Sequence, residues 1–111
     1  MPERVQGRSL LPYLRGEDVA AIHRESVFCE YYNSWTHSNA YGTMLRTPCE
    51  KIVVYHGTDQ GELYDLQSDP DEFENLWDSV SHKDLKLRMM KQCFDRSVLA
   101  MDPLPKRRGP F

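Results

Sequence analysis

Apolar and polar residues alternate along much of the first two thirds of the chain, which predicts β-strands there. β-Branched and aromatic residues dominate the alternating stretches, and turn formers such as Pro48 and Gly57 separate them. The predicted strands are residues 26–32, 40–47, 51–56 and a stretch that begins at Glu62. Because the connections are short, we expect the four strands to pair as an antiparallel meander.

The stretch from Glu62 to Leu76 joins the last predicted strand to the helical part of the chain. Asp69 and Pro70 should end the strand, because aspartate caps backbone N–H groups and proline removes a ladder donor. Acidic residues after Pro70 favour a short helical turn at their position, with Asn75 as its terminator. The acidic residues are Asp71, Glu72 and Glu74, and the expected apolar anchors are Phe73, Leu76 and Trp77.

A longer helix is predicted from Ser81, which has the spacing of a capping box with Asp84, to the residues before Pro103. Apolar residues recur there every three or four positions. The main row is Leu87, Met90, Phe94, Val98 and Met101, and Leu85, Met89 and Cys93 widen it. This face should lie on the sheet. The predicted fold class is therefore α+β, a four-stranded antiparallel β-sheet packed against a C-terminal α-helix.

A brief helical turn is expected near the start, capped by Ser9 and ended by Gly16. Its apolar face is Leu10, Leu11 and Leu14. Such a turn is too short to be stable alone, so these leucines must pack on the sheet or on a body outside the chain. Apolar patches seldom stay bare, and we therefore expect a homo-oligomer, a dimer or larger.

Charge and composition exclude several classes of partner. With 17 acidic and 14 basic residues the net charge is −3, which predicts neither nucleic acid nor an anionic membrane as a partner. No apolar run approaches the length of about 18 residues that a membrane span needs, and the first residues do not resemble a signal peptide. Three scattered cysteines without C-x-x-C spacing favour reduced thiols and a cytoplasmic location.

Candidate chemistry is sparse. Phosphate-loop, Ser-His-Asp and zinc patterns are all missing from the sequence. Trp35, His37 and Asn39 at a predicted hairpin tip have the composition of a ligand-contacting loop, with a plain surface loop as the alternative. Glu30 and Arg46, on neighbouring strands, are expected to form a cross-strand pair, with a binding role as the alternative. A paired-carboxylate site is conceivable after the last strand, but capping and solvation are favoured for Asp65, Asp69, Asp71 and Glu72.

Five blocks of the sequence resemble the C-terminal part of the sulfatases, and they follow in the same order. The most specific reads Glu-Leu-Tyr-Asp-Leu-x-x-Asp-Pro-x-Glu-x-x-Asn-Leu and contains Asp69, Pro70, Glu72 and Asn75 as motif residues. The blocks are residues 6–12, 27–30, 44–47, 51–55 and 62–76. The resemblance therefore covers nearly the whole chain up to about residue 101.

The resemblance implies a parent enzyme of the alkaline phosphatase superfamily. Sulfatases have a large α/β domain with a formylglycine, made from Cys or Ser in a Cys/Ser-x-Pro/Ala-x-Arg motif, and a calcium ion held by Asp and Asn. A small C-terminal sheet and helix complete the fold. None of the three cysteines here stands in such a motif, so no catalytic residue, metal ligand or cofactor is expected in this chain.

The implied function is therefore structural, with the missing catalytic domain as partner and Trp35, His37 and Asn39 at the rim of its substrate pocket. The implied organisation is residues 1–25 as the connection to that domain, 26–101 as the α+β subdomain and 102–111 as an extended tail. Two other hypotheses stay open. One is a free-standing protein-interaction module, and the other is a small independent enzyme that uses Glu30, His37 and Arg46.

Overall fold

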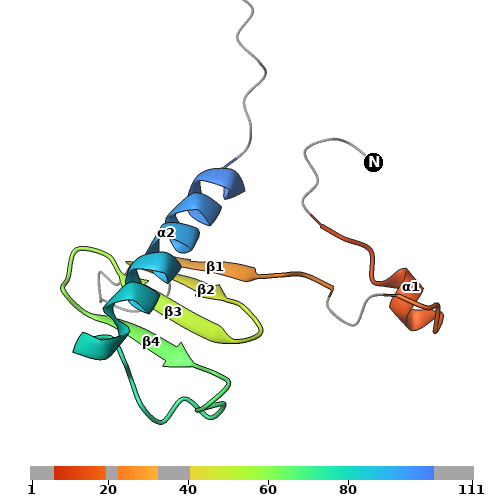
Figure 1. Cartoon of the computed structure of the whole chain (residues 1–111). Helices are drawn as coiled ribbons and strands as arrows, with labels where there is room; N and C mark the ends of the chain where they lie inside the picture. Colours follow the sequence, from red (N-terminus) through yellow and green to blue (C-terminus); the bar gives the residue numbers. More distant parts are fainter. Residues whose placement is uncertain (1–6, 20–22, 33–40, 102–111) are drawn as a thin grey trace, which may run out of the picture.

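The computed structural model describes residues 7–19, 23–32 and 41–101. Its centre is a four-stranded sheet in the order β1-β2-β3-β4, with every neighbouring pair antiparallel. A long helix, α2, lies across one face of this sheet (Figure 1). The strands are β1 (Val27–Tyr32), β2 (Tyr41–Arg46), β3 (Glu50–Tyr55) and β4 (Gly61–Asp65), and the helices are α1 (Leu11–Leu14), the 3₁₀ turn Val80–His82 and α2 (Lys83–Ala100). The predicted α+β architecture is confirmed.

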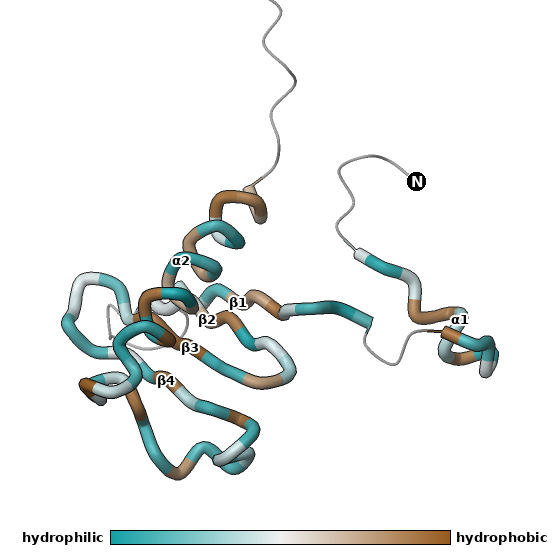
Figure 2. The backbone as a smooth tube through the Cα atoms, viewed as in Figure 1, coloured by the Kyte–Doolittle hydropathy of each residue, from teal (hydrophilic) through white to brown (hydrophobic). Residues whose placement is uncertain are grey.

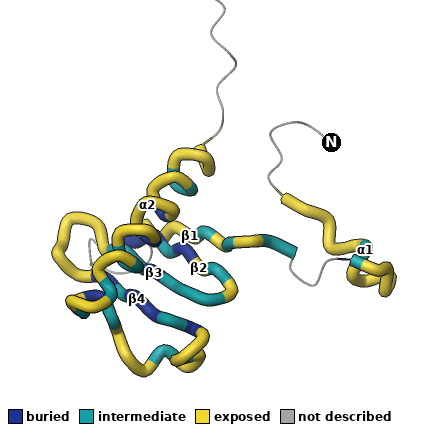
Figure 3. The backbone as a smooth tube through the Cα atoms, viewed as in Figure 1, coloured by how far each residue is buried: buried dark blue, intermediate teal, exposed yellow. Residues whose placement is uncertain are grey.

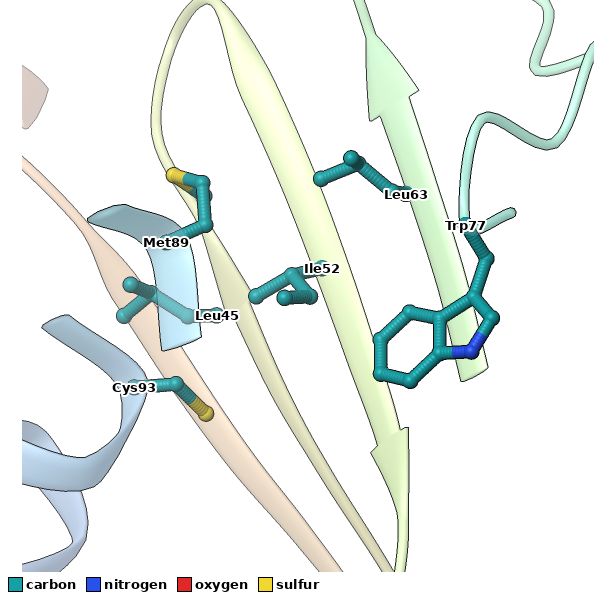
Figure 4. Packing of buried hydrophobic residues seen from close by; sticks show 6 residues of the cluster. All are labelled: Leu45, Ile52, Leu63, Trp77, Met89 and Cys93. Carbon is teal, nitrogen blue, oxygen red and sulfur yellow. The ribbon is translucent and has the colours of Figure 1, made fainter. Parts of the chain in front are cut away.

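The core lies between the sheet and α2. Strand register places Leu45, Ile52 and Leu63 side by side on neighbouring strands, and all three are buried. Met89 and Cys93 of α2 and the indole of Trp77 complete the cluster (Figure 4). A fully buried aliphatic side chain stabilises a fold by about 1.5–3 kcal/mol, so Leu45, Ile52 and Leu63 each contribute on that order.

The helix covers the sheet with the residues that were predicted to widen its apolar face, and not with the predicted main row. Met89 and Cys93 are buried, whereas Leu87 and Phe94 are 70% and 68% exposed. The apolar period is therefore correct, but its centre is wrong by about one position. The last turns of α2 extend past the strands, which leaves the hydrophobic end of the helix uncovered (Figure 2). An 18-residue helix is about 27 Å long, whereas a strand of six residues spans about 20 Å.

The predicted capping box at Ser81 does not form. A 3₁₀ turn occupies Val80–His82, and α2 begins only at Lys83 without a side-chain cap. The hydroxyl of Ser81 lies 3.1 Å from Nδ1 of His82 instead of capping a backbone N–H group. The short turn therefore takes the residues that the capping box would have used.

The turn α1 forms where it was expected but stays uncovered, and its N-cap is Leu10, without a side-chain cap, and not the predicted Ser9. The Leu11 N–H donates to the Ser9 hydroxyl (3.2 Å), and Gly16 ends the turn with a φ of +66°. Leu10 and Leu14 are 57% and 82% exposed, so the sheet does not cover them (Figure 3).

Candidate functional site

The sheet edge at β4 is closed by the segment that follows it, residues 66–77, which we name the edge segment. Oδ1 of Asn75 accepts hydrogen bonds from the N–H groups of Leu63 and Trp77, both 3.0 Å, and its Nδ2 donates to the carbonyl of Gly61 (3.1 Å). The Leu76 N–H adds a bond to the Leu63 carbonyl (2.8 Å). Asn75 thus pairs with edge N–H and C=O groups of β4 that a fifth strand would otherwise pair with. The prediction that Asn75 ends a helical turn is wrong, because no helical turn forms at residues 70–78.

Trp77 anchors the edge segment on the core. Its indole N–H donates to the Asp59 carbonyl (2.9 Å), and its ring lies directly against Gly61. A Cβ atom at Gly61 would overlap that ring, so only glycine fits there. The Lys86 ammonium lies 3.7 Å from the ring centroid and donates to the Trp77 carbonyl. The predicted anchor Phe73, in contrast, is 88% exposed.

The acidic residues of the edge segment hold backbone and side-chain partners. The Asp69 carboxylate, just before Pro70, accepts the N–H groups of Phe73 (3.1 Å) and Glu74 (2.8 Å). Glu72, in the left-handed region with a φ of +60°, forms an ion pair with Lys51. The Gln67 N–H lowers the pKa of Asp65 by donating to its carboxylate. Asp65 and Asp69 therefore stabilise local turns, and Glu72 forms an ion pair. These carboxylates do not converge as an acid/base pair.

Glu30 and Arg46 do not form the predicted cross-strand pair. Register pairs Glu30 with Thr43 and Arg46 with Val27, and strand alternation sends the two side chains to opposite faces of the sheet. Glu30 accepts the Tyr32 hydroxyl (3.1 Å) instead. The independent-enzyme hypothesis requires Glu30 and Arg46 in one pocket, and this geometry overturns it. Its third residue, His37, lies outside the described residues, as do Trp35 and Asn39.

A polar contact that sequence analysis missed lies between α2 and the sheet. The Thr43 hydroxyl is 3.0 Å from Nε2 of His56, and the Cys93 thiol donates to it at 3.6 Å. A cavity of about 360 Å³ adjoins this contact, with Val54, Met90 and Phe94 among its walls. Burial raises the pKa of the Cys93 thiol, which keeps it protonated and unsuited as a nucleophile. Strand alternation, which puts Thr43 on the same face as Leu45, is the signal that could have found it.

The face of the sheet opposite α2 carries a second cavity, of about 340 Å³. We name this surface the open face; its residues are Cys29, Tyr31, Gly42, Met44, Val53 and Tyr55. Its residues stand in two cross-strand rows of three, because register aligns β1, β2 and β3 there. Next to the rows, the hydrogen bond from Tyr55 to Glu62 (2.6 Å) raises the pKa of Tyr55 to about 12. Apart from that ionisable rim, the open face offers apolar contact area.

The described residues do not fit the groups that a sulfatase active site needs. Within these ranges, no three His, Cys, Asp or Glu side chains come together to hold a metal ion. The formylglycine motif is missing from the sequence as well. No helix in the described part of the chain combines the length and apolar character needed to cross a bilayer.

Comparison with known proteins gives a consistent picture. The model of a family described as N-sulphoglucosamine sulphohydrolase, C-terminal, matches residues 1–98. The Δ4,5-hexuronate-2-O-sulfatase of Bacteroides thetaiotaomicron is 36% identical over 76 residues, which cover 68% of this chain and 16% of that protein. A solved 2-O GAG sulfatase superposes with a TM-score of 0.77 at 27% identity, over 90% of this chain and 21% of that one.

A related hydrolase shares the same fold. The phosphonate monoester hydrolase of Silicibacter pomeroyi superposes with a TM-score of 0.72 at 25% identity, over 91% of this chain and 22% of its own chain. In each comparison this chain spans about a fifth of the longer protein or less.

Proposed function

This chain belongs to the N-sulphoglucosamine sulphohydrolase C-terminal family, and from that membership we propose that it serves as the noncatalytic subdomain of an enzyme that hydrolyses sulfate esters. The family match over residues 1–98 carries the proposal. The resemblance to sulfatases seen in the sequence is confirmed by it, and the chain is a sulfatase C-terminal domain.

The catalytic groups of the parent enzyme would lie in a second domain. We propose that the missing catalytic domain is its partner and supplies both the formylglycine and the calcium ion, since the described residues fit neither. Residues 1–25 would connect the two parts, and 102–111 would form a tail. Trp35, His37 and Asn39 stay a proposal for the rim of the substrate pocket.

An activity measurement tests this proposal. We expect the purified 111-residue chain, supplied with calcium, to turn over an aryl sulfate no faster than a blank. A catalytic domain that carries a Cys/Ser-x-Pro/Ala-x-Arg motif, encoded upstream and purified together with the chain, should turn it over. Turnover by the chain alone would show that the chemistry does not depend on a second domain.

Phosphonate monoester hydrolysis is a second candidate for the parent, because the Silicibacter pomeroyi enzyme has the same subdomain fold. The co-purified pair separates the two candidates when it is given matched aryl sulfate and aryl phosphonate substrates. A clear preference for the phosphonate would favour the second candidate, and the role of this chain as a noncatalytic subdomain would be unchanged.

We propose further that the free chain is a homo-oligomer in a reducing, cytoplasmic compartment. Exposed apolar side chains on α1 and α2 support the first part, since such patches usually mark interaction sites. The free thiols of Cys29, Cys49 and Cys93 support the second. The same exposed patches also suit a free-standing interaction module, and an upstream stop codon and promoter would favour that alternative.

A further inference from the structure

We infer that a cavity between β1 and the last turns of α2 is a binding site for an oxyanion, a carboxylate or a sulfate, with the guanidinium of Arg96 as its main donor. The cavity has a volume of about 400 Å³, which is in the size range of small-ligand sites. Its polar and charged walls are Arg24, Ser26, Glu30 and Arg96. The site belongs to this chain and is independent of the proposed function.

Arg96 has a buried donor without a partner. Its Nε atom has no contact with solvent and no hydrogen-bond partner, and the side chain forms no ion pair with the other described residues. A guanidinium stays charged in proteins, and its N–H donors form a planar fork that matches two oxygens of an oxyanion. Because buried polar groups nearly always have a partner, an orphan donor beside a cavity points to an acceptor that binds there.

The same helix carries an arginine that is already paired. Nη2 of Arg88 lies 2.8 Å from Oε1 of Glu50 on β3, so its fork has a carboxylate from the sheet. Arg96 is eight residues further along α2, which is about 12 Å at 1.5 Å per residue. There the helix faces the cavity instead of a carboxylate of β3. The two arginines differ in their partner and not in their element.

Carboxylates of the chain itself do not take the place of the ligand. A smaller cavity of about 230 Å³ also touches Arg96, with Glu25 and Asp95 in its walls. Neither of them forms an ion pair with Arg96, and Asp95 pairs with Lys91. Two carboxylates in the smaller cavity would repel an oxyanion. The oxyanion therefore belongs in the larger cavity.

The charges around the larger cavity favour an anion. Arg24 and Arg96 contribute two positive charges, and Glu30, which accepts the Tyr32 hydroxyl, contributes one negative charge. The nearby carboxyl end of α2 adds a dipole equivalent to about half a negative charge, which does not cancel the remaining positive charge. Arg24 acts here through its charge alone, so the site needs no free donor from it.

Nuclear magnetic resonance of the full chain, titrated with sodium sulfate or sodium acetate at constant ionic strength, tests the inference. We expect saturable shifts of the Arg96 Nε–H and of the Ser26 amide. The dissociation constants should be on the order of 1–10 mM, because one fork of charge-assisted hydrogen bonds in an open cavity binds weakly. Sodium chloride should produce shifts that do not saturate. Absence of saturation with both oxyanions would overturn the inference.

Two arginine variants separate the site from a general effect of charge. Arg96→Gln should weaken sulfate binding at least about tenfold, followed at the Ser26 amide, because it removes the donor fork. The matched control is Arg88→Gln, which removes the same charge from the same helix and should change the dissociation constant less than about twofold. Equal weakening in both variants would overturn the site. If Arg96→Gln is unfolded by circular dichroism, Arg96→Lys replaces it, and loss of the fork should still weaken binding at least about threefold.

A change in Glu30 should act in the opposite direction. Glu30→Gln removes the negative charge from the wall of the cavity, so we expect sulfate to bind about two- to threefold more tightly. A purely structural role of Arg96 would not predict a tighter site. Unchanged or weaker binding would mean that the oxyanion does not lie near Glu30, which would overturn the assignment to this cavity.

The same titration on the chain co-purified with a catalytic domain identifies the source of the oxyanion. Saturable sulfate shifts in that pair assign the site to a free oxyanion. A silent site, together with at least about tenfold weaker association of the Arg96→Gln chain with the domain, assigns it to a carboxylate of that domain. A silent site with unchanged association would mean that the domain only covers the cavity, which overturns the inference. All of these outcomes leave the test of aryl sulfate turnover unaffected.

Discussion

The two edges of the sheet are built in different ways. At β4 the side-chain amide of Asn75 takes up the edge hydrogen-bonding groups, and Trp77 covers the end of the strand. At the other edge, β1 pairs with β2, and among the described strands it has no second neighbour. All of its residues except Phe28 are exposed.

The difference shows where the fold concentrates its stability. The closed edge contributes to the core through Leu63 and Trp77 and ties β4 to the start of α2 through Lys86. An unpaired strand edge is a template for association, and proteins usually cover or charge it. The closed edge therefore stabilises the subdomain, whereas β1 has no second strand neighbour in the described part of the chain.

Replacing Trp77 should destabilise the closed edge most strongly. We expect Trp77→Ala to lower the free energy of unfolding by about 3–5 kcal/mol, because it empties the core next to Gly61 and uncovers β4. Urea denaturation followed by circular dichroism measures the loss. The control, Phe73→Ala in the same segment, should change stability by less than about 0.5 kcal/mol, since Phe73 is 88% exposed. Equal losses would show that Trp77 does not anchor the edge segment.

Alanine substitutions at two strand glycines, Gly61 and Gly42, test the next largest effect on stability. Gly61→Ala should cost about 2–3 kcal/mol, because the new Cβ would overlap the Trp77 ring and push it from the core. Gly42→Ala meets only ordinary contact with Tyr55 and should stabilise the strand by up to about 1 kcal/mol. Melting temperatures at low protein concentration, where self-association is weak, compare the two. A harmless Gly61→Ala would mean that the ring can move aside.

Removing the Asn75 amide should cost less. Asn75→Ala leaves the Leu63 and Trp77 N–H groups without their acceptor, and we expect a loss of about 1–3 kcal/mol. Asn75→Asp keeps an acceptor for both N–H groups but sets a carboxylate oxygen against the Gly61 carbonyl, so it should keep exchange at the Leu63 amide slower than in the alanine variant. Hydrogen exchange provides the local measurement, with faster exchange at the Leu63 amide in the alanine variant and unchanged rates in β1. Uniform acceleration across the sheet would argue for global destabilisation only.

The smallest effect concerns pH. The hydrogen bond from Arg88 of α2 lowers the pKa of Glu50 on β3 below its ordinary value of 4.5. The unfolded chain therefore binds more protons in this range, so the contribution is present above about pH 5 and is lost as pH falls through the folded-state pKa. Since Arg88 is half exposed, we expect less than about 1 kcal/mol. Denaturation at neutral and acidic pH should show a shallower dependence in Glu50→Gln than in the wild type.

The strands could be predicted because their cause is local. Alternation within residues 26–32 and 51–56 places side chains on two faces whatever the rest of the chain does, and short turns leave few ways to connect them. The sulfatase motif was visible for the same reason, as a run of adjacent residues. Register then followed closely enough for the face assignment of Val27, Cys29 and Tyr31 to be correct.

The remaining features depend on partners that are distant in sequence. Asn75 binds backbone groups of Gly61, 14 residues away, so its helix-ending propensity did not decide its conformation. The period of α2 was correct, but which row is buried depends on how the helix crosses the sheet, and Met89 contacts the core where Leu87 does not. Glu30 and Arg46 were expected to pair because their strands are neighbours, but the register separates them by three positions, and an odd separation puts their side chains on opposite faces.

The hydrogen bonds from the Asn75 side chain to β4 also limit how copies of this chain can pair edge to edge. Growth of a continuous sheet needs two available edges on every subunit, one to accept the previous copy and one to receive the next. With β4 occupied by its own edge segment, strand addition has only β1 to use among the described strands. Lateral pairing through the described strands would then stop at two subunits, and the hydrogen bonds of one asparagine side chain would oppose an open-ended fibre.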